Sequence, residues 1–155
     1  MSNTLVPLDP FYFIGIATRT TNEGGKAAED LEKLWGRFYS ENIPGRIPNA
    51  LGPEVYSVYT DYASDYEGEY TTVIGLRVAN LDEIPDGMVG REFGEGKYQK
   101  FVAKGPMPQA VMQQWQEIWQ KDGELNRAYT ADFEVYGPNS QNGDESEVEI
   151  FIAIA

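Results

Sequence analysis

The chain has 155 residues, of which 24% are charged and 41% apolar, a balance typical of one globular domain with a hydrophobic core. Its 25 acidic and 12 basic residues give a net charge of −13. Such a charge disfavours nucleic acid and anionic membranes as direct partners and attracts cations. The absence of cysteine and histidine excludes disulfides, Cys–His and Ser–His nucleophilic sites and the usual zinc sites. Proton transfer near neutral pH would therefore rely on carboxylates, tyrosines, lysines or water.

The N-terminal segment carries no targeting pattern. Residues 1–10 have neither a basic start nor an apolar run, so they do not read as a signal peptide. No stretch of the sequence is apolar over the length that a bilayer requires. We therefore expect a cytoplasmic protein without a membrane partner.

The first half of the chain predicts a strand, a helix and a hairpin. Residues 11–20 are rich in aromatic and β-branched side chains and predict a strand, with Gly15 as a place for a bulge. Residues 55–62 and 70–79 predict two strands of an antiparallel hairpin. The helix between these strands follows from apolar residues at the three-and-four spacing of one helix face. That face consists of Ala27, Ala28, Leu31, Leu34, Trp35 and Phe38.

The second half repeats this order after residues 80–96, which hold Pro85 and four glycines and which we interpret as a linker. The glycines lack the lysine spacing of a phosphate-binding loop, and the nearby acids fit no calcium loop, so we predict no cofactor and no metal. The three strands of this half are predicted at residues 97–104, 131–136 and 148–154. The apolar face of its helix consists of Val111, Met112, Trp115, Ile118 and Trp119.

The two halves therefore form tandem β-α-β-β units, which predicts an α+β fold with antiparallel sheets and pseudo-two-fold symmetry. The units cover roughly residues 11–79 and 97–155 within a single domain of residues 1–155. Aligning Trp35 with Trp115 superposes the apolar faces of the two helices. Either unit alone would bury too little apolar surface, and two packed units should leave a ligand cleft between them.

A series of short segments runs in order from about residue 13 to residue 154. The segments are 56–62 (YSVYTDY), 68–71 (GEYT), 73–75 (VIG), 84–88 (IPDGM), the strand 98–101 followed by Gly105, the helix with Trp115 and Trp119, and 132–136 (DFEVY). In this order and spacing they resemble the gyrase-inhibitor-like (GyrI-like) family of effector-binding domains.

The resemblance implies a duplicated β-α-β-β fold with a pocket between the halves. Members of the family occur alone, as this chain is expected to, or fused to the DNA-binding domains of AraC-type and MerR-type regulators. Multidrug-sensing members bind lipophilic cations between aromatic rings and a buried glutamate, which falls on Glu134 here. Some stand-alone members hydrolyse cyclopropane-containing alkylating toxins.

The strand at residues 131–136 carries the candidate site. Side chains alternate along a strand, so Asp132, Glu134 and Tyr136 share one face, while Phe133 and Val135 face the core. From the pattern alone, an acidic face is more often exposed to solvent than buried. The resemblance reverses this preference for Glu134 and implies the floor of an aromatic pocket. A buried carboxylate there would receive a cation or become protonated.

The other candidates are aromatic residues. Tryptophans on apolar helix faces are more often core than ligand-binding, and among the three we choose Trp119 for the pocket rim. Tyr70 matches a recurring tyrosine of the family and is expected to supply a pocket hydroxyl. Tyr59 has the opposite strand parity to Tyr56 and Tyr62, so these three should not all line one cavity. The predicted ligand-binding set is Glu134, Trp119, Tyr70, Tyr136, Tyr59 and Trp35.

Three functions remain open from the sequence. The first is a module that binds or senses a lipophilic, cationic small molecule without chemistry. The second is a hydrolase, in which Glu134 would activate water and Tyr70 would donate a proton to the leaving oxygen. The third is an acidic protein-interaction module that binds a protein partner, as gyrase inhibition would require.

Overall fold

The fold is described from a computed structural model. The structure describes residues 4–8, 10–52, 54–63, 68–93, 96–107, 109–121, 125, 127–128, 131–137, 140 and 143–154. The strands are β1 (Thr4–Leu8), β2 (Phe11–Thr21), β3 (Val55–Thr60), β4 (Glu69–Val78), β5 (Val89–Phe93), β6 (Gly96–Lys104), β7 (Ala131–Tyr136) and β8 (Glu147–Ile154). The helices are α1 (Lys26–Ser40), α2 (Ile43–Arg46) and α3 (Gln109–Gln120), with 3-10 turns at Glu23–Gly25 and Gly143–Glu145.

All eight strands belong to one antiparallel sheet in the order β1-β6-β8-β7-β3-β4-β2-β5. The first unit supplies β2, β3 and β4 and the second supplies β6, β7 and β8. The units meet where β3 pairs with β7, with Ser57 opposite Glu134. The predicted α+β fold with two β-α-β-β units is therefore confirmed, and the two sheets expected from the sequence are halves of one.

The edge strands are exchanged between the two halves. β1 precedes the first unit in sequence but pairs with β6 of the second, whereas β5 precedes the second unit and pairs with β2 of the first. Neither edge strand was predicted, and β5 corrects the interpretation of residues 80–96 as a linker throughout. Most side chains of β5 are only half-buried, so the segment lacks the alternation that marks a strand in sequence.

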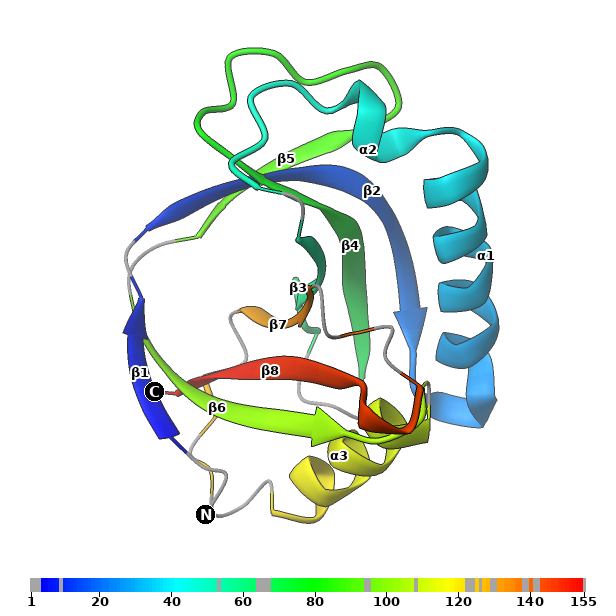
Figure 1. Cartoon of the computed structure of the whole chain (residues 1–155), viewed down its shortest axis with the longest axis vertical. Helices are drawn as coiled ribbons and strands as arrows, with labels where there is room; N and C mark the ends of the chain where they lie inside the picture. Colours follow the sequence, from blue (N-terminus) through cyan, green and yellow to red (C-terminus); the bar gives the residue numbers. More distant parts are fainter. Residues whose placement is uncertain are drawn as a thin grey trace.

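The sheet curls into a half-barrel (Figure 1). Gly15 lies directly opposite Gly75 in an unbroken β2–β4 register, so the bulge expected at Gly15 is absent. A Cβ atom on Gly15 would lie 2.2 Å from the carbonyl oxygen of Ile74, and one on Gly75 would lie 2.0 Å from that of Ile14. Glycine is needed here because the two backbones approach too closely for any side chain.

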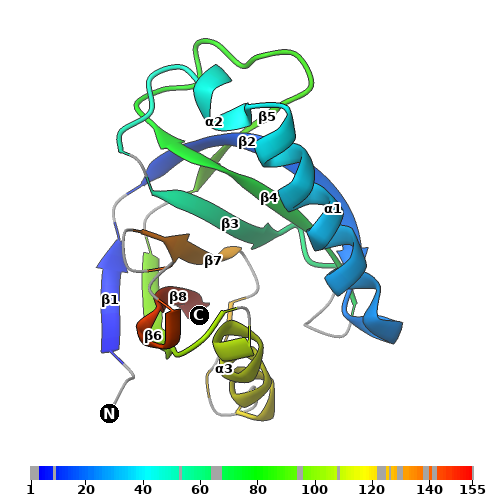
Figure 2. The same ribbon diagram turned by 45° about the vertical axis from the view of Figure 1, so that its right-hand side comes forward.

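Both long helices pack on the outer face of the curl (Figures 1 and 2). Leu34 and Phe38 of α1 are buried against the β2–β4 half of the sheet. Ile118 of α3 is buried against β6 and β8. A third cluster, which includes Phe13 and Phe133, fills the inner face of the sheet with side chains from strands of both units. Burial of one stripe of each helix leaves the neighbouring stripe free to face the space between them.

The expected hairpin forms, but its first strand ends at Thr60 rather than at Tyr62. Asp61 adopts a left-handed conformation with φ 52°, which turns the chain. The short helix α2 follows α1 after two residues, and Pro44 is tolerated in its first turn. Within the described residues, every helix is too short or too polar to cross a bilayer.

Candidate functional site

A cavity of about 580 Å³ lies between α1 and α3, with side chains of β3, β4 and β7 at its base. Figure 2 shows the two helices on the same side of the sheet, flanking β3 and β7. This volume is within the range of ordinary small-molecule sites, which is about 300–1,000 Å³. The described lining is mostly aromatic and aliphatic. It consists of Asn22, Gly25, Ala27, Ala28, Leu31, Glu32, Trp35, Tyr59, Tyr62, Tyr70, Met107, Val111, Met112, Trp115, Gln116, Trp119, Arg127, Glu134 and Tyr136.

Glu134 lies at the base of the cavity with a relative exposure of 2%. Strand alternation directs its side chain to the helix side of the sheet, because Phe133 packs on the inner face. Its Oε2 atom accepts hydrogen bonds from the Tyr59 hydroxyl at 2.9 Å and the Trp115 indole at 2.6 Å. Its Oε1 atom accepts one from the Tyr136 hydroxyl at 2.5 Å. Three elements, β3, α3 and β7, therefore fix this carboxylate.

Asp132 is the neighbouring acid on the same face of β7, and it is fully buried. Its Oδ2 atom accepts hydrogen bonds from Arg127 at 2.7 Å and from the Tyr62 hydroxyl at 2.5 Å, and its Oδ1 atom accepts one from the Ala153 amide at 2.8 Å. The ion pair with Arg127 neutralises this carboxylate inside the protein. Among the described residues, no three acidic side chains come together as a metal site.

Burial controls the protonation of the site. Desolvation raises the pKa of Glu134 above its usual value of 4.5, and the hydrogen bonds from Tyr136, Trp115 and Tyr59 oppose that rise. Desolvation also raises the pKa of Tyr59 and Tyr136 well above the usual value, and the adjacent charge of Glu134 adds to the effect. These tyrosines therefore stay protonated and act as hydrogen-bond donors to the carboxylate.

Aromatic rings form the walls around this carboxylate. Trp115 packs edge-on against Tyr59 with ring centroids 5.5 Å apart, and Trp35 packs edge-on against Tyr136 at 5.1 Å. Tyr70 packs against Tyr59 at 5.8 Å, and Trp119 adjoins Trp115 at 6.4 Å. Two packed aromatic groups, one centred on each helix, thus flank the acid.

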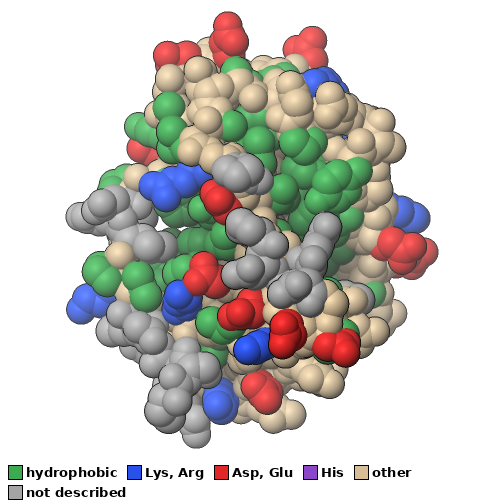
Figure 3. Space-filling model, viewed as in Figure 1, with side chains coloured by type: hydrophobic (Ala, Val, Ile, Leu, Met, Phe, Trp, Pro, Cys, Tyr) green, Lys and Arg blue, Asp and Glu red, His purple; other side chains and the backbone are tan. Residues whose placement is uncertain are grey.

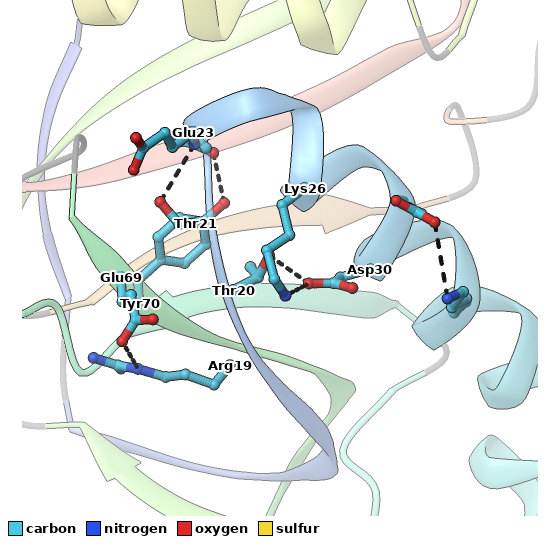
Figure 4. Close-up of polar contacts among 11 residues, drawn as sticks. Arg19, Thr20, Thr21, Glu23, Lys26, Asp30, Glu69 and Tyr70 are labelled. Carbon is cyan, nitrogen blue, oxygen red and sulfur yellow. Dashed lines mark hydrogen bonds and ion pairs between the residues drawn. The ribbon is translucent and has the colours of Figure 1, made fainter.

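The N-terminal end of α1 closes one side of the cavity. Asp30 in the first turns of α1 accepts hydrogen bonds from Thr20 of β2 at 2.8 Å and from Lys26 at 2.6 Å, which tie the helix to the sheet (Figure 4). The Tyr70 hydroxyl donates to the Asn22 side chain at 2.7 Å, next to this end of the helix. Asn22 and Gly25 therefore reach the cavity from the segment that precedes α1.

All of the predicted site residues line this one cavity. Their roles in ligand binding stay predictions. The sequence analysis chose Trp119 among the three tryptophans and missed Trp115. The indole N–H of Trp115 donates a hydrogen bond to Glu134. Tyr56, Tyr59 and Tyr62 do not all line this cavity, since Tyr56 is not part of the described lining. Tyr62 nevertheless lines it together with Tyr59, of opposite parity, because the turn at Asp61 breaks the alternation.

Arg127 was also missed, because it lies outside any predicted element and no pattern in the sequence connects it to Asp132. Trp115, by contrast, had a usable signal, since it occupies the centre of the apolar face of its helix. Most of the remaining lining residues lie on the predicted helix faces or in the segments that lead into the helices, but Glu32 of α1 and Gln116 of α3 lie beside those apolar faces and were also missed.

Comparisons with known proteins agree with this architecture. Residues 4–154 match the model of the Cass2 family, described as integron-associated effector binding protein. The protein YobU of Bacillus subtilis (strain 168), named as a candidate transcriptional regulator, is 27% identical over 150 residues, which are 95% of this chain and 94% of YobU.

Two solved structures share the fold over the whole chain. The integron cassette protein VCH_CASS2 of Vibrio cholerae is 29% identical with a TM-score of 0.78, and the match covers 100% of this chain and 97% of that one. SAV2435, solved bound to tetraphenylphosphonium, is 20% identical with a TM-score of 0.81, and the match covers 100% of this chain and 94% of that one. The resemblance to GyrI-like effector-binding domains is thereby confirmed.

Proposed function

Because the chain belongs to the Cass2 family of integron-associated effector-binding proteins, we propose that its cavity binds a lipophilic organic cation with Glu134 as the counter-ion. The supporting observation is the state of Glu134. It is buried and hydrogen-bonded, yet among the described residues no recorded ion pair includes it. Burial of an unpaired charge costs on the order of several kcal/mol in desolvation free energy, unless a ligand or a proton compensates the charge.

The charges of the cavity support a cation over an anion. Arg127 is the basic residue of the described lining, and its ion pair with Asp132 neutralises it. Glu134 therefore sets the sign of the potential at the base of the cavity. The net charge of −13 acts in the same direction, and Figure 3 shows acidic side chains spread over one face with fewer basic ones between them.

The walls support an apolar ligand with a delocalised or shielded charge. Each aromatic ring that a cation contacts contributes about 0.5–2 kcal/mol, and burial of apolar surface adds roughly 25 cal/mol per Å². The hydrogen bonds from Tyr59, Trp115 and Tyr136 already occupy most of the acceptor positions of Glu134. A cation without N–H donors therefore suits this carboxylate better than a primary amine.

The test uses a pair of ions that differ in charge but hardly in shape. We expect calorimetric titration to detect binding of tetraphenylphosphonium and not of tetraphenylborate. Glu134→Gln should weaken phosphonium binding by about 2 kcal/mol or more, roughly 30-fold, because a buried charge pair is lost. Glu83→Gln removes the same charge from an exposed position outside the cavity and should leave affinity unchanged. Equal phosphonium affinity in wild type and Glu134→Gln would refute the counter-ion role.

The hydrolase hypothesis receives less support from the same geometry. Tyr70, expected as the proton donor to a leaving group, donates its hydroxyl to Asn22 instead. Burial, followed by the charge of Glu134, raises the pKa of Tyr70, which makes it a weaker acid. We infer that the site binds without chemistry; turnover of a cyclopropane-bearing electrophile that disappears in Glu134→Gln would overturn this.

The cellular role proposed here is the sensing or sequestering of such a cation. The name of the relative YobU supports a link to regulation of transcription. The acidic surface supports a protein partner over direct contact with nucleic acid. Co-purification with and without tetraphenylphosphonium tests this link, since a regulatory partner should be retained in one of the two states only.

A further inference from the structure

A second acidic residue, Glu32, lines the cavity on the side of α1. It differs from Glu134 in its environment, because Glu134 is 2% exposed whereas Glu32 is exposed to solvent. The two carboxylates therefore lie at different depths of one cavity, Glu134 at the base and Glu32 at the mouth. Asp132, the other acid of β7 that faces the helices, is fully buried and paired with Arg127.

Glu32 differs from its acidic neighbours on α1. Asp30 pairs with Lys26 at 2.6 Å and Glu29 pairs with Lys33 at 4.0 Å, each across one helical turn. The residues three and four positions from Glu32 on α1 are Ala28, Glu29, Trp35 and Gly36, and none of them carries a positive charge. Within the described part of the chain, no recorded ion pair includes Glu32.

The space beside Glu32 is open along the helix. A Cβ atom placed on Gly36, one turn further, would have no neighbour within 4 Å. In the alignment of the two units that superposes Leu31 on Val111, the position of Glu32 corresponds to Met112 of α3. Met112 also lines the cavity and is 55% exposed. The mouth of the cavity thus carries an acidic side chain, Glu32, on α1 and a flexible apolar side chain, Met112, on α3.

We propose that Glu32 is a second cation-recognition residue, and that the cavity favours elongated dications with one charge at Glu134 and the other at the mouth. This inference rests on the proposed function, since the first charge is the cation held at the base. The stem between the charges would pass the apolar side chains of Leu31, Val111 and Met112. A monocation of equal length leaves Glu32 without a partner.

The experiment compares two ligands that differ in one atom. The dication carries an aromatic quaternary nitrogen at one end of a polymethylene chain and a trimethylammonium group at the other. In the matched monocation a tert-butyl group replaces the trimethylammonium group, so the shape is kept and the charge is lost. Both are titrated at low ionic strength over a series of chain lengths, against wild type, Glu32→Gln, Glu134→Gln and Glu83→Gln.

The measured quantity is the ratio of the two dissociation constants, monocation over dication. At the chain length that spans the cavity, this ratio should be about two- to fivefold larger in wild type than in Glu32→Gln, as for an exposed ion pair, and added salt should reduce it. Glu83→Gln should give the wild-type ratio. The role of Glu32 would be overturned if wild type and Glu32→Gln gave the same ratio at every chain length. It would also be overturned if Glu83→Gln lowered the ratio as much as Glu32→Gln does.

Failure of the proposed function gives a different pattern. In that case Glu134→Gln would bind the monocation as tightly as wild type does, whatever Glu32→Gln does to the ratio. If Glu134→Gln weakens the monocation but Glu32→Gln leaves the ratio unchanged, the base of the site is upheld and the second recognition residue is rejected.

Discussion

Asp132 and Glu134 lie two residues apart on one face of β7, and both are buried, but they have different counter-charges. Asp132 forms an ion pair with Arg127 at 2.7 Å, whereas the described residues give Glu134 only neutral donors from Tyr59, Trp115 and Tyr136. The fold thus supplies Asp132 with a counter-charge, and in the function proposed above the ligand supplies one to Glu134.

This difference predicts the effect of removing Arg127. Arg127→Met should lower the free energy of unfolding by about 3–5 kcal/mol, because it leaves Asp132 buried without its ion pair. The added substitution Asp132→Asn should recover part of that loss, since no uncompensated charge then remains. Chemical denaturation of the single and double variants measures both effects. Additive losses in the double variant would contradict the pairing.

The pH of the medium should control cation binding through Glu134. Burial raises the pKa of this carboxyl, and only the ionised form attracts a cation. The affinity for tetraphenylphosphonium should therefore be highest at pH values above the raised pKa and should fall as the pH falls through that pKa. The loss should begin at a higher pH than the range in which an exposed carboxyl titrates. Binding near that pKa should also release a proton, which titration calorimetry in buffers of different ionisation enthalpy detects.

The same linkage acts on the stability of the protein without ligand. A carboxyl with a raised folded-state pKa binds protons more tightly in the native state, so its contribution to stability falls as the pH rises from the unfolded to the folded pKa. Glu134→Gln removes this contribution.

The binding prediction has its own contrary outcome. If affinity for the phosphonium stays constant from neutral pH down to pH values at which exposed carboxyls are protonated, Glu134 does not carry the required charge.

Trp115 should tune this titration. Trp115→Phe keeps an aromatic ring on α3 but removes the indole N–H that lies 2.6 Å from Glu134. Because that hydrogen bond lowers the pKa of Glu134, its loss should raise the pKa further and move the acid-side loss of binding to higher pH. Trp119→Phe is the matched control, since its ring lines the same wall while the hydrogen bonds recorded for Glu134 come from other residues. An identical pH profile in wild type and Trp115→Phe would contradict the assignment.

The sequence predicted the site where local geometry is regular. Strand alternation places Glu134 and Tyr136 on one face of β7, and helix periodicity places Trp35 and Trp119 toward the interior. Prediction failed where the regularity ends. Tyr62 follows the turn at Asp61, where alternation no longer applies.

The fold shows the same division between local and non-local information. The repeated order of strand, helix, strand and strand follows from periodicity within short windows. The exchange of the edge strands between the halves depends on pairing between segments far apart in the chain. β1 pairs with β6 of the second unit, and β5 pairs with β2 of the first unit. Gly15 was recognised as unusual, but its reason lies in Gly75, which only the three-dimensional register places opposite it.

Two glycines should respond in opposite directions to substitution by alanine. Gly75→Ala would place a methyl group 2.0 Å from the carbonyl oxygen of Ile14, so the two central strands of the first unit must move apart. We expect a loss of about 3 kcal/mol or more in the free energy of unfolding, together with weaker cation binding, because β4 supports the base of the cavity. Gly36→Ala lies within α1, where the added methyl group meets no atom within 4 Å and alanine favours the helix. This variant should gain about 0.5–1 kcal/mol. Equal stabilities of the two variants in chemical denaturation would show that the close approach of β2 and β4 does not constrain the curl of the sheet.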